Sequence, residues 1–305
     1  MDSTSNSAIT QSENRLTLST EEVDALLRKV ETDLSNNTFD LSDRQLIQQM
    51  IECLGDSRGL TRLGFAESLG VVGKLAVPFL IEALANHPNV VVQRAAAKTL
   101  TLIADPASIP VLLNSFLHDP DQVVRNSCIG ALAAMGEVVV PSLIDILEND
   151  KEQEATKGHA AWALAFIGVP AKEQLYRAFN SQSADLRSAV VGAIAKITEE
   201  QPEARAFDLL LKSLKDCNVS VRSEAAAALG NLTYKPAIPL LIELLKNSEA
   251  ESRKSAALAL MKMEDFATLD ALQSALENET EIDVKQVIQL AFDRVERQTD
   301  SLDWD

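Results

Sequence analysis

The chain has 305 residues, and its 28 basic and 45 acidic residues give a net charge of −17 at pH 7. A field of this sign repels phosphate backbones and anionic lipid, which disfavours nucleic-acid binding. Hydrophobic residues make up 46% and aromatic residues only 4%. The recurring Ala and Leu favour closely packed helices with small side chains over a β-rich core. We therefore predict an all-α fold.

The two ends of the chain differ from its middle. Residues 1–19 are rich in Ser, Thr and Asn, which predicts disorder, and residues 20–41 form a capping helix and linker, with N-cap candidates just ahead of an apolar stripe. Residues 298–305 are an acidic tail, in which Trp304 is either a fraying end or a short docking motif. Without an export signal or an apolar run of about 18 residues, we expect a cytoplasmic protein with no membrane insertion.

Residues 42–297 repeat with a period of about 32 residues, and such a period predicts stacked supersecondary units. One column of the repeat is basic or amidic, and the position seven residues later is always apolar. The first column holds Arg62, Gln93, Arg125, Lys157, Arg187, Arg222, Arg253 and Lys285, and the second holds Leu69, Leu100, Leu132, Leu164, Ile194, Leu229, Leu260 and Phe292.

Each copy predicts two amphipathic helices, A and B, of which B carries both columns. Prolines recur in the first turn of helix A, where the missing N–H is harmless, at Pro78, Pro110, Pro141 and Pro239. Glycines stand eleven residues after the basic column, where a left-handed C-cap ends helix B, at Gly73, Gly136 and Gly168.

These features resemble the HEAT repeat family. A further mark of that family is an Asp six residues before the Arg, as in Asp119 with Arg125 and Asp216 with Arg222. The resemblance implies an α-solenoid of about eight HEAT-like two-helix repeats wound into a right-handed superhelix, with the Asp and Arg side chains joining neighbouring repeats as a ladder. Ser181 and Asn247 replace the Asp in other copies, so we expect the ladder to be broken in places.

Thiols and imidazoles are scattered. The three cysteines are odd in number and far apart, which argues against disulfides, and no two Cys or His residues share a helical turn as zinc ligands commonly do. We therefore predict no metal site and treat Cys53 and Cys128 as core thiols. Cys217 follows Asp216 in a turn, so we expect it to be exposed, either as an acceptor of an iron–sulfur cluster or covalent adduct or as a solvent-facing thiol with no role.

The inner face of the B helices is the strongest candidate for a site. Positions two, five and nine after the basic column share one stripe, and most of them are small or polar. The middle copy differs, with His159, Trp162 and Phe166. These rings predict a pocket flanked by small residues, with Trp162 as a stacking platform and His159 as a proton donor. The alternative is that Trp162 only packs against the adjacent helix. Four cations are available for ligand carboxylates: Arg94, Arg125, Lys157 and Arg187.

The segment Gly158-His159-Ala160-Ala161-Trp162-Ala163-Leu164 looks like the central aromatic B helix of E/F-type phycobilin lyases of cyanobacterial phycobilisomes. As that resemblance implies, the ligand is a phycobilin, an open-chain tetrapyrrole that is not permanently bound. The acceptor cysteine belongs to a phycobiliprotein client, and a second lyase subunit completes the pair. The lyase needs no nucleophile of its own, and the sequence holds no self-contained catalytic motif.

A different class of function stays open beside the lyase. Repeat arrays usually bind other proteins along an extended concave surface, so the chain is alternatively a non-catalytic adaptor. Its partner would then be an iron–sulfur assembly factor or a component of a photosynthetic complex. A visible spectrum in the presence of a bilin discriminates between the two hypotheses.

Overall fold

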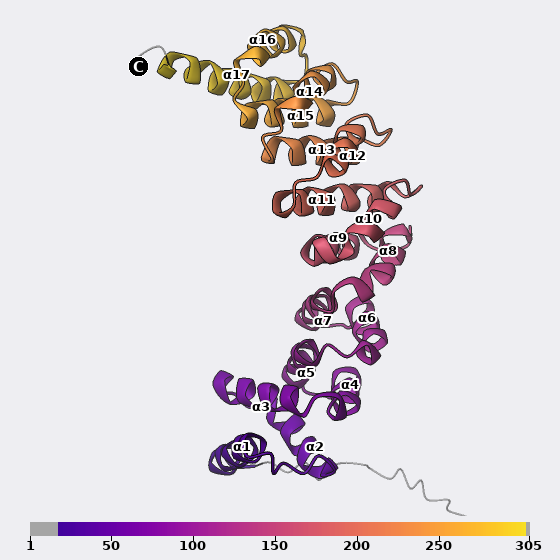
Figure 1. Ribbon diagram of the computed structural model, residues 1–305, viewed down its shortest axis with the longest axis vertical. Helices are drawn as coiled ribbons and strands as arrows, with labels where there is room; N and C mark the ends of the chain where they lie inside the picture. Colours follow the sequence, from indigo (N-terminus) through magenta and orange to yellow (C-terminus); the bar gives the residue numbers. More distant parts are fainter. Residues whose placement is uncertain (1–17, 303–305) are drawn as a thin grey trace, which may run out of the picture. The chain divides into compact units, whose positions relative to one another are not determined.

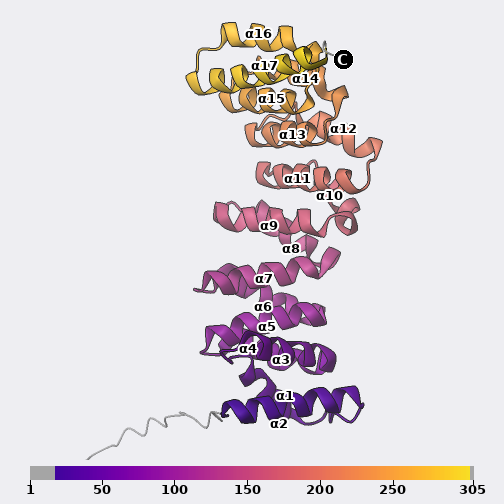
Figure 2. The ribbon, with the colours of Figure 1, turned by 90° about the vertical axis from the view of Figure 1, so that its left-hand side faces the viewer.

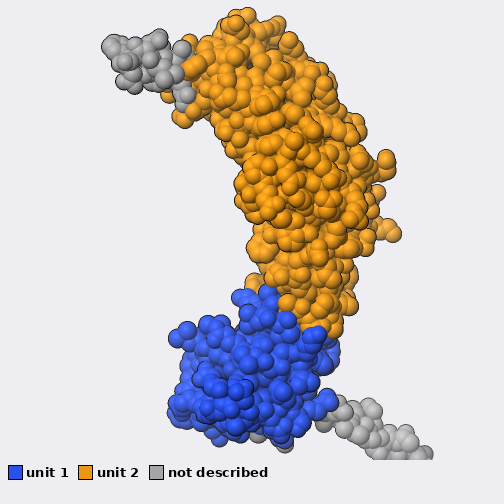
Figure 3. All heavy atoms as spheres, viewed as in Figure 1, with its two compact units in different colours: residues 1–103 blue, residues 104–305 orange. Residues whose placement is uncertain are grey.

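The computed structural model describes the backbone of residues 18–302 and the side chains of residues 18–297. Across that range the chain is helical, with no β-strand, and the seventeen α-helices are joined by short turns and 3-10 helices. The predicted all-α repeat fold is therefore confirmed. Most of the segment predicted to be disordered, residues 1–17, lies outside the described residues, as does Trp304. The chain divides into two compact units, residues 1–103 and residues 104–305 (Figure 3).

Unit 1 consists of one preceding helix and two A–B pairs. In chain order its helices are α1 (Thr20–Ser35), α2 (Arg44–Cys53), α3 (Gly59–Val72), η1 (Gly73–Leu75), α4 (Val77–Asn86) and α5 (Val90–Ile103). At the start of α1, the Ser19 hydroxyl accepts from the backbone N–H of Glu22, and the Glu22 carboxylate accepts from the backbone N–H of Ser19. This reciprocal capping box satisfies two donors of the first turn. Val23 and Val30 are buried on the face of α1 that packs against α3.

Unit 2 consists of six further A–B pairs. Its helices are η2 (Pro106–Ser108), α6 (Ile109–His118), α7 (Gln122–Ala134), η3 (Gly136–Val139), α8 (Val140–Glu148), α9 (Glu154–Ile167), η4 (Val169–Ala171), α10 (Lys172–Ala178), α11 (Ala184–Glu200), α12 (Ala204–Ser213), α13 (Val219–Asn231), η5 (Lys235–Ala237), α14 (Ile238–Leu244), α15 (Ala250–Met263), η6 (Phe266–Thr268), α16 (Leu269–Asn278) and α17 (Ile282–Leu302). Helix α17 continues to Leu302, so residues 298–302 are helical where the sequence predicted the beginning of an acidic tail.

Within unit 2 the B helices form one layer and the A helices another (Figure 1). Each B helix from α7 to α15 contacts the B helix that follows, and Figure 2 shows these helices lying one above the next. In Figure 1 they lie on the left of unit 2, which is its concave side in Figure 3. The apolar column of the B helices is fully buried from Leu69 to Leu260. In the last copy Phe292 is only half-buried, because no further B helix follows α17 in the described residues. The handedness of the superhelix stays a prediction.

The local signals in the sequence act where they were expected. Pro78, Pro110, Pro141 and Pro239 all lie in the first turn of an A helix. Gly73, Gly136 and Gly168 all have positive φ angles, between 62° and 74°. In Gly73 and Gly168 the ψ angles are −136° and −130°, so these two end their helices in a region beyond the left-handed helical one, where only glycine is comfortable.

The basic or amidic column ties six of the eight B helices to the turn that precedes them. In each of these six copies the side chain donates to the backbone carbonyl of the residue six positions earlier. The donor–acceptor pairs are Arg62–Asp56 (2.5 Å), Gln93–His87 (2.8 Å), Arg125–Asp119 (2.5 Å), Arg187–Ser181 (2.9 Å), Arg222–Asp216 (2.8 Å) and Arg253–Asn247 (3.0 Å). Because the acceptor is a main-chain oxygen, this bond forms whatever side chain occupies that position.

The ladder between repeats depends on a side-chain acceptor in the next copy. Arg187 donates twice to the carboxylate of Asp216 in the next copy, at 2.8 and 2.9 Å, and Arg253 does the same to Glu279, at 2.7 and 2.9 Å. Where the next copy has Asn247, Arg222 bonds instead to the hydroxyl of Ser252. The ladder is therefore broken at Asn247, as predicted, but not at Ser181, where Lys157 joins the two copies by binding Asp185. For an Arg of the column, the acid is needed in the copy that follows it rather than in its own.

The Arg253–Glu279 pair predicts a loss of stability in acid. The hydrogen bonds from Arg253 lower the pKa of Glu279 below its ordinary value, although burial opposes them. A carboxylate whose pKa is lower in the folded chain adds stability above its ordinary pKa, and that stability is lost as the pH falls through the folded-state value. We expect the thermal midpoint to fall between about pH 5 and pH 3, and to fall less in Glu279→Gln. Equal slopes in a series of thermal denaturations would contradict this.

Candidate functional site

Helix α9 presents two aromatic rings to the outside while it buries its small residues. Ala160, Ala163 and Leu164 are fully buried against the neighbouring helices. Trp162 and Phe166 lie one turn apart on the opposite face, where they are 49% and 61% exposed, and their ring centroids are 5.3 Å apart at an interplanar angle of 33°. Residues four apart share a helix face, so the spacing alone brings these rings together. Trp162 is not enclosed between helices, as the packing alternative required.

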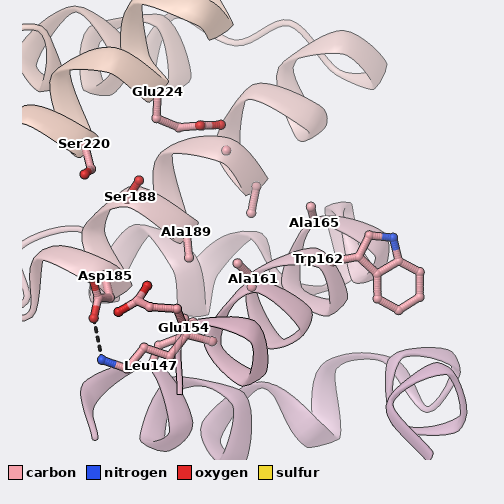
Figure 4. A pocket seen from close by; sticks show the side chains of 14 residues that line it. Leu147, Glu154, Ala161, Trp162, Ala165, Asp185, Ser188, Ala189, Ser220 and Glu224 are labelled. Atoms are coloured by element: carbon pink, nitrogen blue, oxygen red, sulfur yellow. Dashed lines mark hydrogen bonds and ion pairs between the residues drawn. The ribbon is translucent and has the colours of Figure 1, made fainter. Parts of the chain in front are cut away.

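A hollow of about 440 Å³ lies beside Trp162 on the concave side of unit 2. It extends over α9, α11 and α13. Figure 4 shows Trp162 and Glu224 at two separate edges, with the Trp162 ring directed away from the other labelled side chains. Its lining residues are Leu147, Glu154, Lys157, Gly158, Ala161, Trp162, Ala165, Asp185, Ser188, Ala189, Gly192, Ala193, Ser220 and Glu224. Glycine and alanine form much of the surface between the two ends, so a flat ligand meets few obstructing side chains.

Two of the three predicted aromatic positions lie outside this lining. Phe166 contacts Trp162 but does not line the hollow. The His159 ring is half-buried and meets the ring of Phe116 in α6 edge-on, with centroids 6.2 Å apart. It therefore faces the preceding repeat. The prediction that His159 donates a proton to a ligand beside Trp162 stays a prediction that this lining does not support.

Three predicted cations, Lys157, Arg187 and Arg125, bind groups within the chain itself. Lys157 is buried, and its Nζ is 2.5 Å from the Asp185 carboxylate; this hydrogen bond raises the pKa of Lys157 despite partial desolvation. Arg187 is bound to Asp216, and Arg125 to the Asp119 carbonyl and the Gln122 side chain. Neither lines the hollow.

Arg94 belongs to α5 in unit 1. Lys157 is thus the one predicted cation that lines the hollow, and the binding of ligand carboxylates by these four residues stays a prediction.

The cysteines lie as expected. Cys53 and Cys128 are buried, and burial raises the pKa of their thiols to about 11 and about 12, which disfavours the reactive thiolate. Cys217 is exposed, with its Sγ 3.6 Å from the Asp216 carboxylate and 3.8 Å from Arg187. Between residues 18 and 297, no three His, Cys, Asp or Glu side chains are grouped as metal ligands would be.

Sequence reasoning missed the importance of Glu224. The residue appears in the inner stripe of its copy, but nothing in the pattern distinguished it from other polar positions. The available signal was Gly192, the equivalent of Trp162 in the intervening copy. A methyl group at Gly192 would lie 2.8 Å from Oε1 of Glu224. Only glycine at this position leaves room for the carboxylate where it lies.

Both the repeat geometry and the sequence assign the chain to a class. A profile of HEAT repeats matches residues 45–133, 77–156, 140–218 and 207–292, and the chain belongs to the HEAT-repeat proteins. More specifically, it is 37% identical over 276 residues to the bilin biosynthesis protein MpeU of Synechococcus sp. (strain WH8020), covering 90% of this chain and 93% of that protein. The chain belongs to the family of that bilin biosynthesis protein, which confirms the resemblance seen in the sequence.

Two weaker likenesses concern the repeat itself. A deoxyhypusine hydroxylase of Candida albicans is 28% identical, over 70% of this chain and 77% of that protein. The solved complex of CpcE and CpcF of phycocyanin lyase from Nostoc sp. PCC7120 is 23% identical, over 50% of this chain and 98% of that chain, with a TM-score of 0.44. We draw no function from either.

No single helix in the described part of the chain is both long enough and apolar enough to cross a membrane. One bent pair, Gly59–Leu75 with Val77–Asn86, has the length and composition to do so.

Proposed function

We propose that this chain binds an open-chain tetrapyrrole and assists its covalent attachment to a cysteine of a phycobiliprotein in the cytoplasm. The observation that carries the proposal is the 37% identity, over nine-tenths of the chain, to a bilin biosynthesis protein. The hollow supports it physically, because a half-exposed indole beside a surface of glycine and alanine suits a long, flat, conjugated ligand.

The chemistry asks little of the chain itself. The client's thiolate adds to the exocyclic double bond of the pigment: a carbon–sulfur bond forms, and the neighbouring carbon takes a proton. No group leaves, and no external oxidant or reductant is consumed. The chain's part is to hold the pigment in one conformation against Trp162 and to present its reactive edge, which converts a slow encounter into an oriented one. A client phycobiliprotein and a second lyase subunit are the partners that this proposal implies.

The proposal is tested by the visible spectrum of the purified chain mixed with phycocyanobilin or co-expressed with a pathway that makes it. We expect a shifted and sharpened absorption band, because stacking on Trp162 restricts a pigment that is flexible in water. Free pigment, and pigment mixed with a different HEAT-repeat protein, provide the baseline. If neither the mixed sample nor the co-expressed sample differs from this baseline, the proposal is rejected.

One observation favours the adaptor as a second candidate function. Helix α3 exposes Leu60, Leu63 and Val71, at 85%, 50% and 70%, and these positions fall on one side of the helix. Apolar side chains gathered in this way are typical of protein-binding surfaces. Recovery of a stable partner with a colourless eluate from a cyanobacterial lysate would favour the adaptor, whereas a coloured eluate would favour the pigment-binding function.

A further inference from the structure

The hollow beside Trp162 is acidic. Three carboxylates, from Glu154, Asp185 and Glu224, line it, and Lys157 is the one basic side chain among its lining residues. Because Lys157 is already bound to Asp185 at 2.5 Å, its charge is largely balanced by that partner. An anionic group placed inside the hollow would therefore meet net repulsion, and an N–H donor or a cation would be attracted.

Glu224 is the carboxylate of the hollow that can accept a hydrogen bond from such a donor. In the described part of the chain it has no hydrogen bond or ion pair. Although much of its side chain is exposed, its Oε1 lies directly over the bare Cα of Gly192, where an added methyl would be 2.8 Å away. Desolvation of the carboxyl group raises the pKa of Glu224 above its ordinary value.

The spacing of the helices limits what can reach both ends of the hollow. Trp162 is on α9 and Glu224 is on α13, with α11 between them. Packed helices lie about 8–10 Å apart, so two such steps span roughly 16–20 Å. A ligand that contacts both Trp162 and Glu224 must therefore extend across α11, and a chain of four rings has the length to do so. Between them, Gly158, Ala189 and Gly192 leave the path open.

We propose that the Glu224 carboxylate accepts hydrogen bonds from the pyrrole N–H groups on the inner edge of an open-chain tetrapyrrole whose face lies against Trp162. This inference rests on the proposed function and adds the orientation of the pigment. The inner, N–H-bearing edge enters the hollow, and the propionates on the outer edge point away from it. The propionates then need no cation inside the hollow, and the four cations that the sequence suggested are not required there.

The test compares Glu224→Gln with the unchanged chain in titrations with phycocyanobilin. A hydrogen bond to a charged acceptor is worth enough that we expect binding at least about tenfold weaker in the variant, with the absorption band shifted back toward that of free pigment. The thermal midpoint should be unchanged or higher, because the substitution removes an unpaired and partly desolvated charge. Glu251→Gln is the matched control: it removes the same charge from exposed Glu251 on the neighbouring helix α15, outside the hollow.

A second ligand tests the orientation without any mutation. The dimethyl ester of phycocyanobilin has no propionate charge and keeps its pyrrole N–H groups, so we expect the unchanged chain to bind it about as tightly as the free acid. Loss of binding to the ester, or a Glu224→Gln variant with the affinity and spectrum of the unchanged chain, would overturn the inference. If the unchanged chain gives no spectral change with either pigment, it is the proposed function that fails.

Discussion

Replacing Trp162 with alanine is expected to abolish the shifted absorption of a bound bilin and to weaken binding by about tenfold or more. Stacking of a conjugated ring on an aromatic side chain is worth about 1–3 kcal/mol when removed by alanine substitution, and Trp162 is the one aromatic residue that lines the hollow. The ring is 49% exposed, so the fold should lose at most about 1 kcal/mol of its free energy of unfolding. Pigment titration and thermal denaturation measure the two effects separately.

Two further variants show whether an effect of Trp162→Ala belongs to the hollow. Trp162→Phe keeps a smaller stacking surface and should retain part of the spectral shift. Leu290→Ala truncates an exposed apolar side chain on α17, which does not line the hollow, and should leave pigment binding unchanged. If Trp162→Ala binds pigment like the unchanged chain, or if Leu290→Ala weakens binding equally, the indole is not the platform.

Replacing Arg253 with leucine is expected to give the largest loss of stability among these variants, about 3 kcal/mol, because it leaves a buried carboxylate unpaired. The Arg253 side chain is 14% exposed and its partner Glu279 only 3%. The carbonyls of Asn247 and Ser248 also lose a donor. Chemical denaturation followed by circular dichroism measures the change in the free energy of unfolding.

The comparison that isolates the buried pair is an exposed one. Lys215 and Glu243 also join neighbouring repeats, at 3.8 Å, but their side chains are 63% and 72% exposed, so Lys215→Leu should cost well under about 1 kcal/mol. Combining Arg253→Leu with Glu279→Leu should recover much of the loss, because no unpaired charge remains. Equal losses in Arg253→Leu and Lys215→Leu would mean that the ladder contributes no more than a surface ion pair.

The site was only partly predictable from the sequence. Trp162 was found because an indole among small residues interrupts the inner stripe, and Phe166 follows from its spacing of four residues. His159 lies three residues before Trp162, on the same side of α9, yet its ring packs on Phe116 in the preceding repeat. Glu224 comes from a helix that is two repeats away. Which side chains meet across three helices depends on their separation and rotation, and a periodic pattern does not encode either quantity.

The sequence by itself determined the repeat: its phase, its buried apolar column, and the prolines and glycines that begin and end the helices. These features are local, because each depends on residues within one or two turns of the same helix. The tertiary structure alone decided which side chain of the next copy bonds to a basic residue of the column: Asp185 for Lys157, Glu279 for Arg253 and the Ser252 hydroxyl for Arg222. It also decided that Glu224 lies unpaired over Gly192. Such partners are selected by distances of a few ångströms between helices, which arise only when the repeats stack.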